Sequence, residues 1–517
     1  MKQLKFLNYE KIKPRLYQEF IASTAIEKNT LCILPTGMGK TLVAIMVAAY
    51  RLEKFPDSKI LMVAPTRPLV NQHMKNFSNL MNLEKTEFIA LTGKIHPEDR
   101  KVLYGKGKLF FATPQLIEND VENKILDLND YSLIIIDECH RSVKKYAYTS
   151  VIEHYLKQSS HPLILGLTAS PGGIKDKIEE VKKSLHIEAV EIRTEQDYDV
   201  QPYIQETKVE RVYVELPEEL KRIRTYLEQA YIKRLEWLMT SKLIYSMKIT
   251  KRELLDLQKE IGRMYEQTRD FMVARALTTC AQAIKIEHAI GLLETQGITP
   301  LYKYFLDLEK NKKSVATRNV LNDPKIINAI KETKELFVKG IEHPKLEKLL
   351  EIVKEEIKMN PRTKIIVFAN YRSSVEKIVN TLQLNGIEAR GFIGQAIKDG
   401  KGLKQKEQIE ILNEFRYELF NVLTATSIGE EGLDIVATDT AIFYDEVSSE
   451  IRLIQRRGRV GRQVPGRVIF LITKGTRDEG YYWSAVHKEQ RMKRILYEMK
   501  EGMIKKNEVS LKDFINR

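Results

Sequence analysis

Short apolar runs alternate with amphipathic stretches along residues 1–205. Each run is rich in β-branched or aromatic side chains and ends at a polar or glycine-containing turn, which is typical of a buried strand. Strands that alternate with helices predict a parallel sheet covered by helices on both faces. The predicted strands are residues 30–34, 59–65, 108–113, 132–138 and 162–170.

The pattern changes between Pro217 and Pro300, a stretch that contains no proline. Residues 218–296 contain only two glycines, Gly262 and Gly291, and most of their abundant residue types are strong helix formers. Apolar side chains recur at helical spacing, which favours an insertion of a few long helices with an apolar core. These side chains are Leu227, Tyr231, Leu235, Leu238, Ile286, Ile290 and Leu293.

The strand–helix alternation returns from about residue 341. The second set of predicted strands is residues 364–370, 386–392, 420–426, 439–445 and 467–473. The sequence therefore predicts an α/β fold of two parallel-sheet domains with an all-helical insertion between them. The predicted domains are residues 1–205 and 341–495, the insertion is residues 206–340, and a charged C-terminal tail covers residues 496–517.

The composition narrows the class of protein. The net charge is +14, which is compatible with a solvated surface and also favours a polyanionic partner, nucleic acid first. The three cysteines, Cys32, Cys139 and Cys280, are far apart, which excludes a disulfide scaffold and a cysteine-rich metal site. The longest apolar run covers residues 42–50, whereas a membrane span needs about 18 residues. We therefore expect a cytoplasmic, nucleoid-associated protein with no membrane partner.

Residues 34–41, LPTGMGKT, lie between an apolar strand and an apolar helix, the context of a phosphate-binding loop. Gly37 and Gly39 let backbone N–H groups turn toward phosphate oxygens, while Lys40 supplies a positive charge. The hydroxyl of Thr41 is expected to bind Mg²⁺. Leu34 departs from the general pattern, which has glycine at this position. We call residues 34–41 the phosphate loop, and expect Thr36, Gly37, Met38, Gly39, Lys40 and Thr41 to bind ATP.

The second motif of the site is SLIIIDECH, residues 132–140, which contains two adjacent acidic residues. Its apolar part predicts a buried strand, and Asp137 and Glu138 follow at the carboxyl end. Asp137 is placed to hold Mg²⁺, and Glu138 is placed to orient or deprotonate the attacking water. Taken alone, this motif is equally compatible with an acidic strand end without chemistry. Cys139 is expected to be a packed residue rather than a nucleophile.

The motifs LPTGMGKT, DECH, TAS (168–170) and QRRGRVGR (455–462), in this order, resemble those of superfamily 2 helicases. Further matches are PRLYQ (14–18), APTRPLVNQ (64–72), TGK (92–94), ATPQ (112–115) and TATSIGEEGLDI (424–435). The helical insertion resembles that of RIG-I-like receptors, Dicer helicase domains and the branch of Hef and Fanconi anemia group M. Longer stretches, including IGLLETQG, IVFANYRSS and SSEIRLIQRRGRVGR, resemble the archaeal Hef helicase region. The resemblance implies two RecA-like motor domains.

The resemblance also implies the roles of residues in the nucleotide site. Gln18 is expected over the adenine with Arg15 nearby, and Thr168 and Ser170 are expected to link the nucleotide to the nucleic-acid face. In the second domain, Gly432 and Asp434 are expected to approach the nucleotide. Gln455, Arg459 and Arg462 are expected to be catalytic, with Arg462 as the first and Arg459 as the second candidate for an arginine finger.

Nucleic-acid contacts are implied in both motor domains. Hydroxyls, backbone N–H groups and a few cations suit phosphate contacts that carry no sequence information. The basic face of the insertion resembles a thumb that engages duplex or branched DNA, although a mixed-charge helical face is usually only solvated. The expected contacts are Thr66, Arg67, Thr92, Gly93, Lys94 and Thr113 in the first domain and Asn370, Arg372, Gly394, Gln395 and Thr426 in the second.

Three functions are compatible with these observations. The leading one is an ATP-dependent DNA helicase that acts on forks or four-way junctions, with replication or repair proteins as possible partners. The second is a double-stranded-RNA-dependent ATPase of RIG-I-like type, and the third is a scaffold that has lost hydrolysis. Full-length Hef proteins also carry a nuclease marked by E-R-K-x-x-x-D, a string that this sequence lacks. The sequence is compatible with the helicase portion of a longer protein and with a helicase-only member, and we expect no intrinsic nuclease activity in either case.

Overall fold

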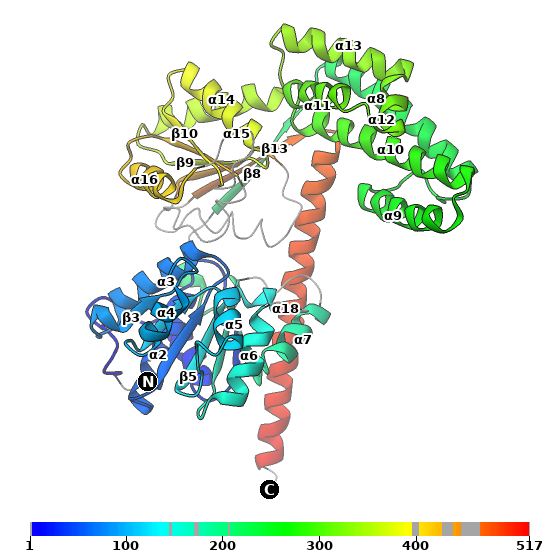
Figure 1. Ribbon diagram of the computed structural model, residues 1–517. Helices are drawn as coiled ribbons and strands as arrows, with labels where there is room; N and C mark the ends of the chain where they lie inside the picture. The colour runs from blue at the N-terminus through cyan, green and yellow to red at the C-terminus, as the bar shows by residue number, and fades with distance from the viewer. Residues whose placement is uncertain are drawn as a thin grey trace.

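Two parallel sheets, a helical insertion and a long C-terminal helix make up the structure (Figure 1). The computed structural model describes residues 3–143, 147–169, 175–204, 207–394, 403–426, 438–445 and 466–515. All strand pairs within the two described sheets are parallel, so the predicted fold class is confirmed. Among the described residues, no helix combines the length and the apolar character needed to cross a bilayer.

The described part of the first sheet has seven strands in the order β3-β4-β2-β5-β6-β1-β7. The strands are β1 (Thr30–Ile33), β2 (Lys59–Val63), β3 (Phe88–Ala90), β4 (Leu109–Ala112), β5 (Tyr131–Asp137), β6 (Ile164–Thr168) and β7 (Ala189–Ile192). The connecting helices are α1 (Leu16–Ala25), α2 (Lys40–Lys54), α3 (Arg67–Leu80), α4 (Pro97–Tyr104), α5 (Pro114–Glu122), α6 (Ala147–Gln158) and α7 (Lys175–Ser184). Short 3-10 turns cover Lys85–Glu87, Cys139–Arg141 and Gln201–Tyr203.

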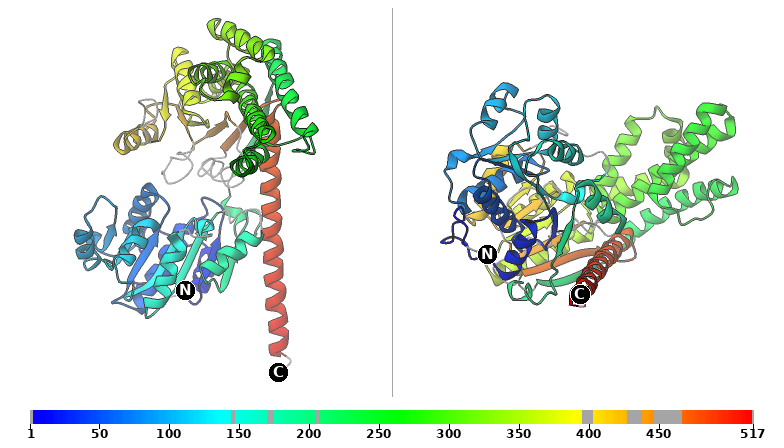
Figure 2. Two further views of the ribbon diagram at one scale, coloured as in Figure 1. Left: turned by 45° about the vertical axis from the view of Figure 1, so that its right-hand side comes forward. Right: turned by 90° about the horizontal axis from the view of Figure 1, so that it is seen from below.

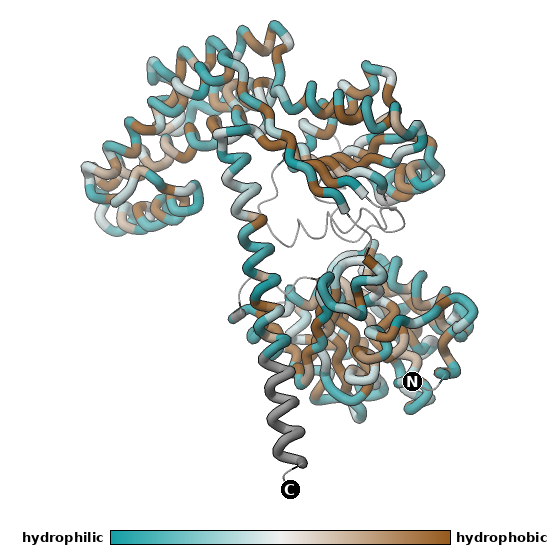
Figure 3. Tube along the Cα trace, turned by 180° about the vertical axis from the view of Figure 1, so that it is seen from behind, coloured by the Kyte–Doolittle hydropathy of each residue, from teal (hydrophilic) through white to brown (hydrophobic). Residues whose placement is uncertain are grey.

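Alternate residues of each strand point into two cores, one on each face of the first sheet. In β5, Leu133 and Ile135 pack in the core formed with α1, α2 and α3. Ile134 and Ile136 pack in the opposite core, formed with α5, α6 and α7. Because both faces are covered, the central strands are largely apolar, as Figure 3 shows for the interiors of both sheets.

The described part of the second sheet has six strands in the order β10-β11-β9-β12-β13-β8. The strands are β8 (Thr207–Val214), β9 (Ile365–Phe368), β10 (Ala389–Phe392), β11 (Val422–Ala425), β12 (Thr440–Phe443) and β13 (Gly466–Thr473). One core packs against α14 (Pro344–Met359) and α15 (Arg372–Leu384). The opposite core packs against α16 (Gln405–Arg416) and the first turns of α18 (Arg477–Ile515).

The insertion is helical in all its described elements, as the absence of proline and the apolar stripe predict. Its helices are α8 (Glu218–Thr240), α9 (Lys251–Thr268), α10 (Phe271–Thr295), α11 (Ile298–Lys310), α12 (Val315–Leu321) and α13 (Pro324–Val338). Two of these helices have N-cap side chains that accept hydrogen bonds from free backbone N–H groups of the first turn. Thr250 accepts from the N–H of Glu253, and Asp270 accepts from the N–H groups of Met272 and Val273. The apolar stripe of α8 and α10 lies in two adjoining cores.

Two predicted domain boundaries differ from the structure. The insertion was expected to begin at residue 206, but β8 pairs with β13 over eight residue pairs as the edge of the second sheet. The sequence of β8 did not predict a strand, because charged Lys208, Glu210 and Arg211 stand between its apolar residues. An edge strand accommodates such residues because it is largely exposed to solvent. The charged tail was expected from residue 496, but α18 continues through this position as a single helix.

Helix α18 contacts both motor domains. Near its start, Tyr482 and Ala485 lie in a core of the second sheet. Farther along, Ile495 and Leu496 are buried in the core of the first sheet that also contains α5, α6 and α7. Figures 1 and 2 show this helix running from the second domain along the side of the first. One helix therefore connects the two sheets in addition to the main chain between β7 and β8.

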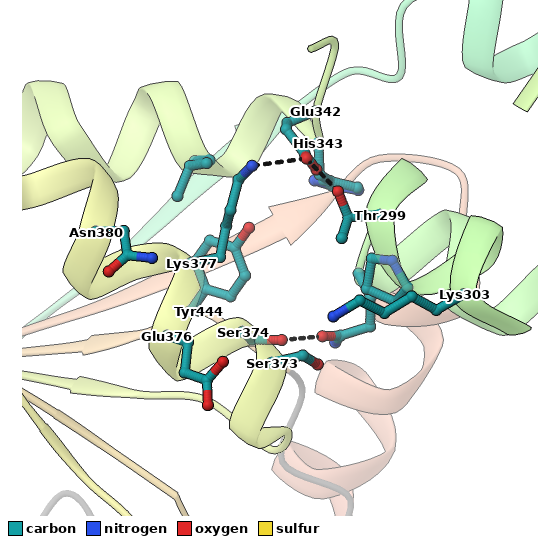
Figure 4. A pocket seen from close by; sticks show the side chains of 13 residues that line it. Thr299, Lys303, Glu342, His343, Ser373, Ser374, Glu376, Lys377, Asn380 and Tyr444 are labelled. Atoms are coloured by element: carbon teal, nitrogen blue, oxygen red, sulfur yellow. Dashed lines mark hydrogen bonds and ion pairs between the residues drawn. The ribbon is translucent and has the colours of Figure 1, made fainter. Parts of the chain in front are cut away.

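Buried polar contacts join the insertion to the second sheet. Gln296, which follows α10, donates from Nε2 to Oδ1 of Asp445 at 2.7 Å and accepts from the hydroxyl of Ser374. Oδ2 of Asp445 accepts from the backbone N–H of Asn370 at 2.5 Å. Burial raises the pKa of Asp445 to about 6. Ser374 lines the polar pocket between these parts of the chain, in which Lys377 pairs with Glu342 (Figure 4). The insertion is thus anchored at the start of α15.

A buried ion pair holds α14 against the second sheet, and it predicts a sensitive position. Lys345 is fully buried, donates to the carbonyl of Tyr444 at 3.0 Å and pairs with Asp478 of α18. We expect Lys345→Met to lower the free energy of unfolding by about 3–5 kcal/mol, because it leaves the carboxylate of Asp478 buried without its partner. Denaturant unfolding followed by circular dichroism measures this change.

Lys348→Met on the same helix is the matched control. Its amino group pairs with Glu351 at the surface, 2.6 Å away. We expect this change to alter the free energy of unfolding by less than about 1 kcal/mol, because exposed pairs contribute little. Equal losses in the two variants would contradict the role assigned to the buried pair.

Candidate nucleotide site and nucleic-acid interface

The phosphate loop connects buried β1 to the start of α2. Gly37 and Gly39 have φ values of +84° and +82°, a left-handed conformation that glycine adopts without strain. Helix α2 begins at Lys40, so the free N–H groups of its first turn lie at the end of the loop. The Thr36 hydroxyl is buried and has no hydrogen-bond partner among the described residues. Backbone N–H groups, a hydroxyl and a lysine together form a donor set suited to phosphate.

Helix α1 is attached to the phosphate loop through Gln18. The side-chain Oε1 of Gln18 accepts from the N–H of Arg15 at 2.9 Å, and its Nε2 donates to the carbonyl of Met38 at 3.0 Å. The Tyr17 hydroxyl donates to the same carbonyl at 2.9 Å. The guanidinium of Arg15 lies over the ring of Tyr203, 4.1 Å from its centroid. Arg15 and Gln18, which were predicted to lie at the adenine, therefore lie beside the phosphate loop.

Asp137 is the last residue of β5, and its carboxylate contacts a buried histidine. Nε2 of His73, on α3, lies 2.8 Å from Oδ2 of Asp137, and the hydroxyl of Tyr148 donates to the Asp137 carbonyl at 2.8 Å. Burial alone would raise the pKa of Asp137, but the charge and hydrogen bond of His73, together with the charge of Lys40, hold this pKa below its ordinary value. The group is therefore an ionised carboxylate facing the charge of the phosphate loop.

Glu138 connects this strand to the end of β6. Its φ of +50° is left-handed, which turns the chain sharply after β5. Nδ1 of His140 lies 3.2 Å from Oε2 of Glu138 and 3.2 Å from the hydroxyl of Thr168. Glu138 and Thr168, two predicted site residues from different motifs, thus share one histidine. Cys139 is buried, and burial raises the pKa of its thiol well above the ordinary value, in keeping with a packed residue.

The donor set suits Mg²⁺, the metal that the helicase resemblance implies. Mg²⁺ takes oxygen ligands, usually one or two from the protein and the rest from water and substrate phosphates. Asp137 supplies an ionised carboxylate, and Thr41 supplies a hydroxyl in the first turn of α2. Bound there with ATP, the metal would neutralise charge on the phosphates.

A row of polar residues continues along the same edge of the first sheet. Since all strands are parallel, the segments that follow β2, β3 and β4 emerge at the edge where β1, β5 and β6 also end. Thr66 caps α3 and its hydroxyl is buried with no partner among the described residues. The guanidinium of Arg67 lies beside Gly93. The predicted contacts on this row are Thr66, Arg67, Thr92, Gly93, Lys94 and Thr113.

The second sheet has a similar row. Asn370 and Arg372 follow β9, Gly394 follows β10 and Thr426 follows β11, three neighbouring parallel strands. Arg372 donates to the Gly394 carbonyl at 3.3 Å, so two of these predicted residues are in contact. The other predicted residues of this domain lie outside the described residues; they are Gln395, Gly432, Asp434, Gln455, Arg459 and Arg462. Ser170 of the first domain also lies outside the described residues.

Comparisons with known proteins identify the family. Three family models match successive segments of the chain. The model "Type III restriction enzyme, res subunit" matches residues 11–173, and the model "Putative ATP-dependent RNA helicase, helical bundle" matches residues 219–340. The model "Helicase conserved C-terminal domain" matches residues 344–464. The crystal structure of the Hef helicase domain of Pyrococcus furiosus matches with a TM-score of 0.74 and 44% identity, covering 93% of this chain and 99% of that one. This chain belongs to the ATP-dependent helicases of the Hef and Fanconi anemia group M branch.

The curated relatives are longer than this helicase. A putative ATP-dependent RNA helicase of Methanocaldococcus jannaschii is 44% identical over 501 residues, which are 96% of this chain and 63% of the relative. The ATP-dependent DNA helicase MPH1 of Pyricularia oryzae is 34% identical, with 94% and 46% covered. The Fanconi anemia group M protein homolog of Mus musculus is 31% identical, with 93% and 26% covered. The chain thus spans less than two thirds of each of these relatives.

Several residues at the site were not predicted from the sequence. His73, Tyr148 and Tyr203 contact Asp137 or Arg15, but none belongs to the part of a motif that was singled out. His140 stands within DECH, so its contact with Glu138 and Thr168 could have been expected from the motif. His73 directly follows APTRPLVNQ, yet the sequence carries no signal that this position reaches β5.

The double contact of Gln18 predicts a measurable effect on ATP binding. In Gln18→Glu, a carboxylate would replace the amide that donates to the carbonyl of Met38, leaving two acceptors face to face. We expect the KM for ATP to rise about tenfold or more, because losing a buried partner costs about 1–3 kcal/mol. Steady-state ATP hydrolysis measures this, with Glu19→Gln on the same helix as the control. An unchanged KM would contradict the assignment.

Proposed function

We propose that this chain is an ATP-driven DNA motor that acts on branched DNA, at replication forks and four-way junctions, in the repair or restart of stalled forks. The observation that carries the proposal is the shared edge of the first sheet. There the phosphate loop and Asp137 lie beside the polar row that follows β2, β3 and β4. Relatives named DNA helicases, including MPH1 of Pyricularia oryzae, support DNA as the substrate.

In this proposal each residue of the nucleotide site has a chemical task. Lys40 and the first turn of α2 would bind phosphate oxygens, and Thr41 and Asp137 would hold Mg²⁺. Glu138 orients the attacking water and accepts its proton, a role that contributes about 10²–10⁴-fold in rate. In the second motor domain, Gly432 and Asp434 would approach the nucleotide, and Gln455, Arg459 and Arg462 would complete the catalytic set. Arg462 is the first and Arg459 the second candidate for the arginine finger that neutralises charge developing on the γ-phosphate.

Nucleic-acid binding would use both polar rows. Hydroxyls and backbone groups suit phosphate oxygens, and Arg67 and Arg372 add positive charge. Such contacts are independent of sequence and weaken with salt because binding releases counterions. When ATP bridges the two domains, the rows approach each other, and hydrolysis removes the bridge. Translocation then follows from a cycle of differential affinity between the rows.

The far end of the insertion supports a contact with the branch. Where α8 ends and α10 begins, Phe271 and Met272 are exposed by 77% and 54%. Exposed basic residues, including Lys242, Arg269 and Arg275, belong to the same end of the insertion. Apolar side chains among cations suit bases and phosphates that a fork or junction leaves accessible. Figure 2 shows this part of the insertion projecting away from both sheets.

A double-stranded-RNA-dependent ATPase is the second candidate. The relative from Methanocaldococcus jannaschii and the family that matches residues 219–340 both carry the name RNA helicase. DNA and RNA backbones offer the same phosphates to the polar rows, so these rows do not distinguish between them.

ATP hydrolysis by the pure protein at fixed salt tests the proposal. The compared conditions are no nucleic acid, single-stranded DNA, duplex DNA, a synthetic fork, a four-way junction and double-stranded RNA. We expect the fork or the junction to stimulate hydrolysis most, and Lys40→Ala to abolish it in all conditions. Strongest stimulation by double-stranded RNA would replace the proposal with the second candidate. Hydrolysis that persists in Lys40→Ala would contradict the nucleotide site.

Charge reversal at the far end of the insertion tests the branch contact. We expect Lys242→Glu with Arg275→Glu to reduce the salt dependence of fork affinity by about two phosphate contacts. Hydrolysis without nucleic acid should stay unchanged, because both residues are remote from the phosphate loop. Lys334→Glu on α13 with Lys339→Glu at the end of this helix is the matched control. The branch contact would be wrong if both pairs changed fork binding equally.

A further inference from the structure

A buried histidine connects the candidate metal ligand to helix α3, which begins in the polar row that follows β2, β3 and β4. His73 and Asp137 are in contact through Nε2 and Oδ2 at 2.8 Å, and their side chains are exposed by only 6% and 8%. Water therefore does not compete effectively for this hydrogen bond. The direction of the hydrogen bond fixes the orientation of the Asp137 carboxylate. Outer partners of this kind orient ligating groups in metal sites.

In this hydrogen bond His73 is the donor and Asp137 is the acceptor. A carboxylate that holds a metal is ionised and accepts only, so Nε2 of His73 carries the proton and donates it to Oδ2. Nδ1 of His73 is buried without a hydrogen-bond partner among the described residues. The Nε2–H group of the ring is therefore directed at Asp137.

Helix α3 carries His73 at one point and the expected strand contacts at another. Arg67 is its first residue and Thr66 its cap, six and seven positions before the histidine. At 1.5 Å per residue, about 9 Å of helix separates Arg67 from His73. Phe77, on the same helix, is fully buried, which ties α3 to the sheet. A shift of the first turn of α3 thus reaches the carboxylate through a short, stiff element.

We propose that His73 is a positioning residue that orients Asp137 for Mg²⁺-nucleotide and, through α3, couples nucleic-acid contact at Thr66 and Arg67 to the nucleotide site. This inference rests on the proposed function, because it needs Asp137 to act as a metal ligand and α3 to meet nucleic acid. A histidine that only filled the core would be replaceable by any apolar side chain of similar size.

Three substitutions separate positioning from packing. His73→Leu keeps apolar volume but removes the donor. His73→Gln places an amide N–H₂ near the position of Nε2, whereas His73→Asn places its amide nearer to Nδ1 and too far from Asp137. Lys75→Ala, at an exposed position on the same helix, is the control. Calorimetry measures ADP affinity with and without Mg²⁺, and thermal melting reports folding.

We expect His73→Leu and His73→Asn to weaken the Mg²⁺-dependent binding of ADP by about 10- to 100-fold. ADP binding without Mg²⁺ should remain as in the wild type, and His73→Gln should recover most of the loss. Fork DNA should stimulate hydrolysis less in His73→Leu than in the wild type, while the affinity of the nucleotide-free protein for fork DNA stays unchanged. Lys75→Ala should leave all of these quantities unaltered.

Contrary outcomes are distinguishable. Wild-type Mg²⁺-dependent ADP binding in His73→Leu, together with its loss in Asp137→Ala, would overturn the positioning role and leave the proposed function standing. Unimpaired hydrolysis in Asp137→Ala would contradict the proposed nucleotide site itself. Weakened Mg²⁺-dependent binding with full stimulation by fork DNA would overturn the coupling through α3. If His73→Leu does not fold, equal losses in His73→Asn and His73→Gln would overturn the proposal.

Discussion

Parallel pairing of the strands is the constraint on which the rest of the structure depends. When every strand of a sheet runs in the same direction, all carboxyl ends lie at one edge, and ligands bind there in open α/β sheets. The order β3-β4-β2-β5-β6-β1-β7 places three strands that end in hydroxyl and cationic residues beside three that end in the phosphate loop, Asp137 and Thr168. The proposed nucleotide site and the proposed nucleic-acid contacts therefore share one edge without sharing residues.

The contacts between the parts of the chain indicate which parts move together. Gln296 and the buried pair of Lys345 and Asp478 join the insertion, α14 and α18 to the second sheet through buried polar groups. Such groups tolerate little displacement, because an unpaired buried charge is costly. The insertion and the second sheet thus form one body. Helix α18 also lies on the first sheet through Ile495 and Leu496, so a change in the domain arrangement must act on this helix.

Most of the fold could be predicted from the sequence, and much of the site could not. The ten strands predicted from apolar runs are all present, because most of them are central strands that are buried on both faces and largely apolar. The polar edge strand β8 and the short strands β3 and β7 lack this signal. The phosphate loop and Asp137 follow from local motifs. The contact of His73 with Asp137 spans 64 residues of sequence and depends on how α3 packs against β5, which no local pattern reveals.

The central claim is that nucleotide and nucleic acid bind to coupled parts of one edge. The most direct test is a thermodynamic cycle that measures the affinity for fork DNA with ADP and with a non-hydrolysable ATP analogue, and the affinity for each nucleotide with and without the fork. The account predicts that the ratio of the two fork affinities departs from one, typically by about 5- to 150-fold, and that the fork changes the ratio of the nucleotide affinities by the same factor. Fork affinities that are equal with both nucleotides would contradict it.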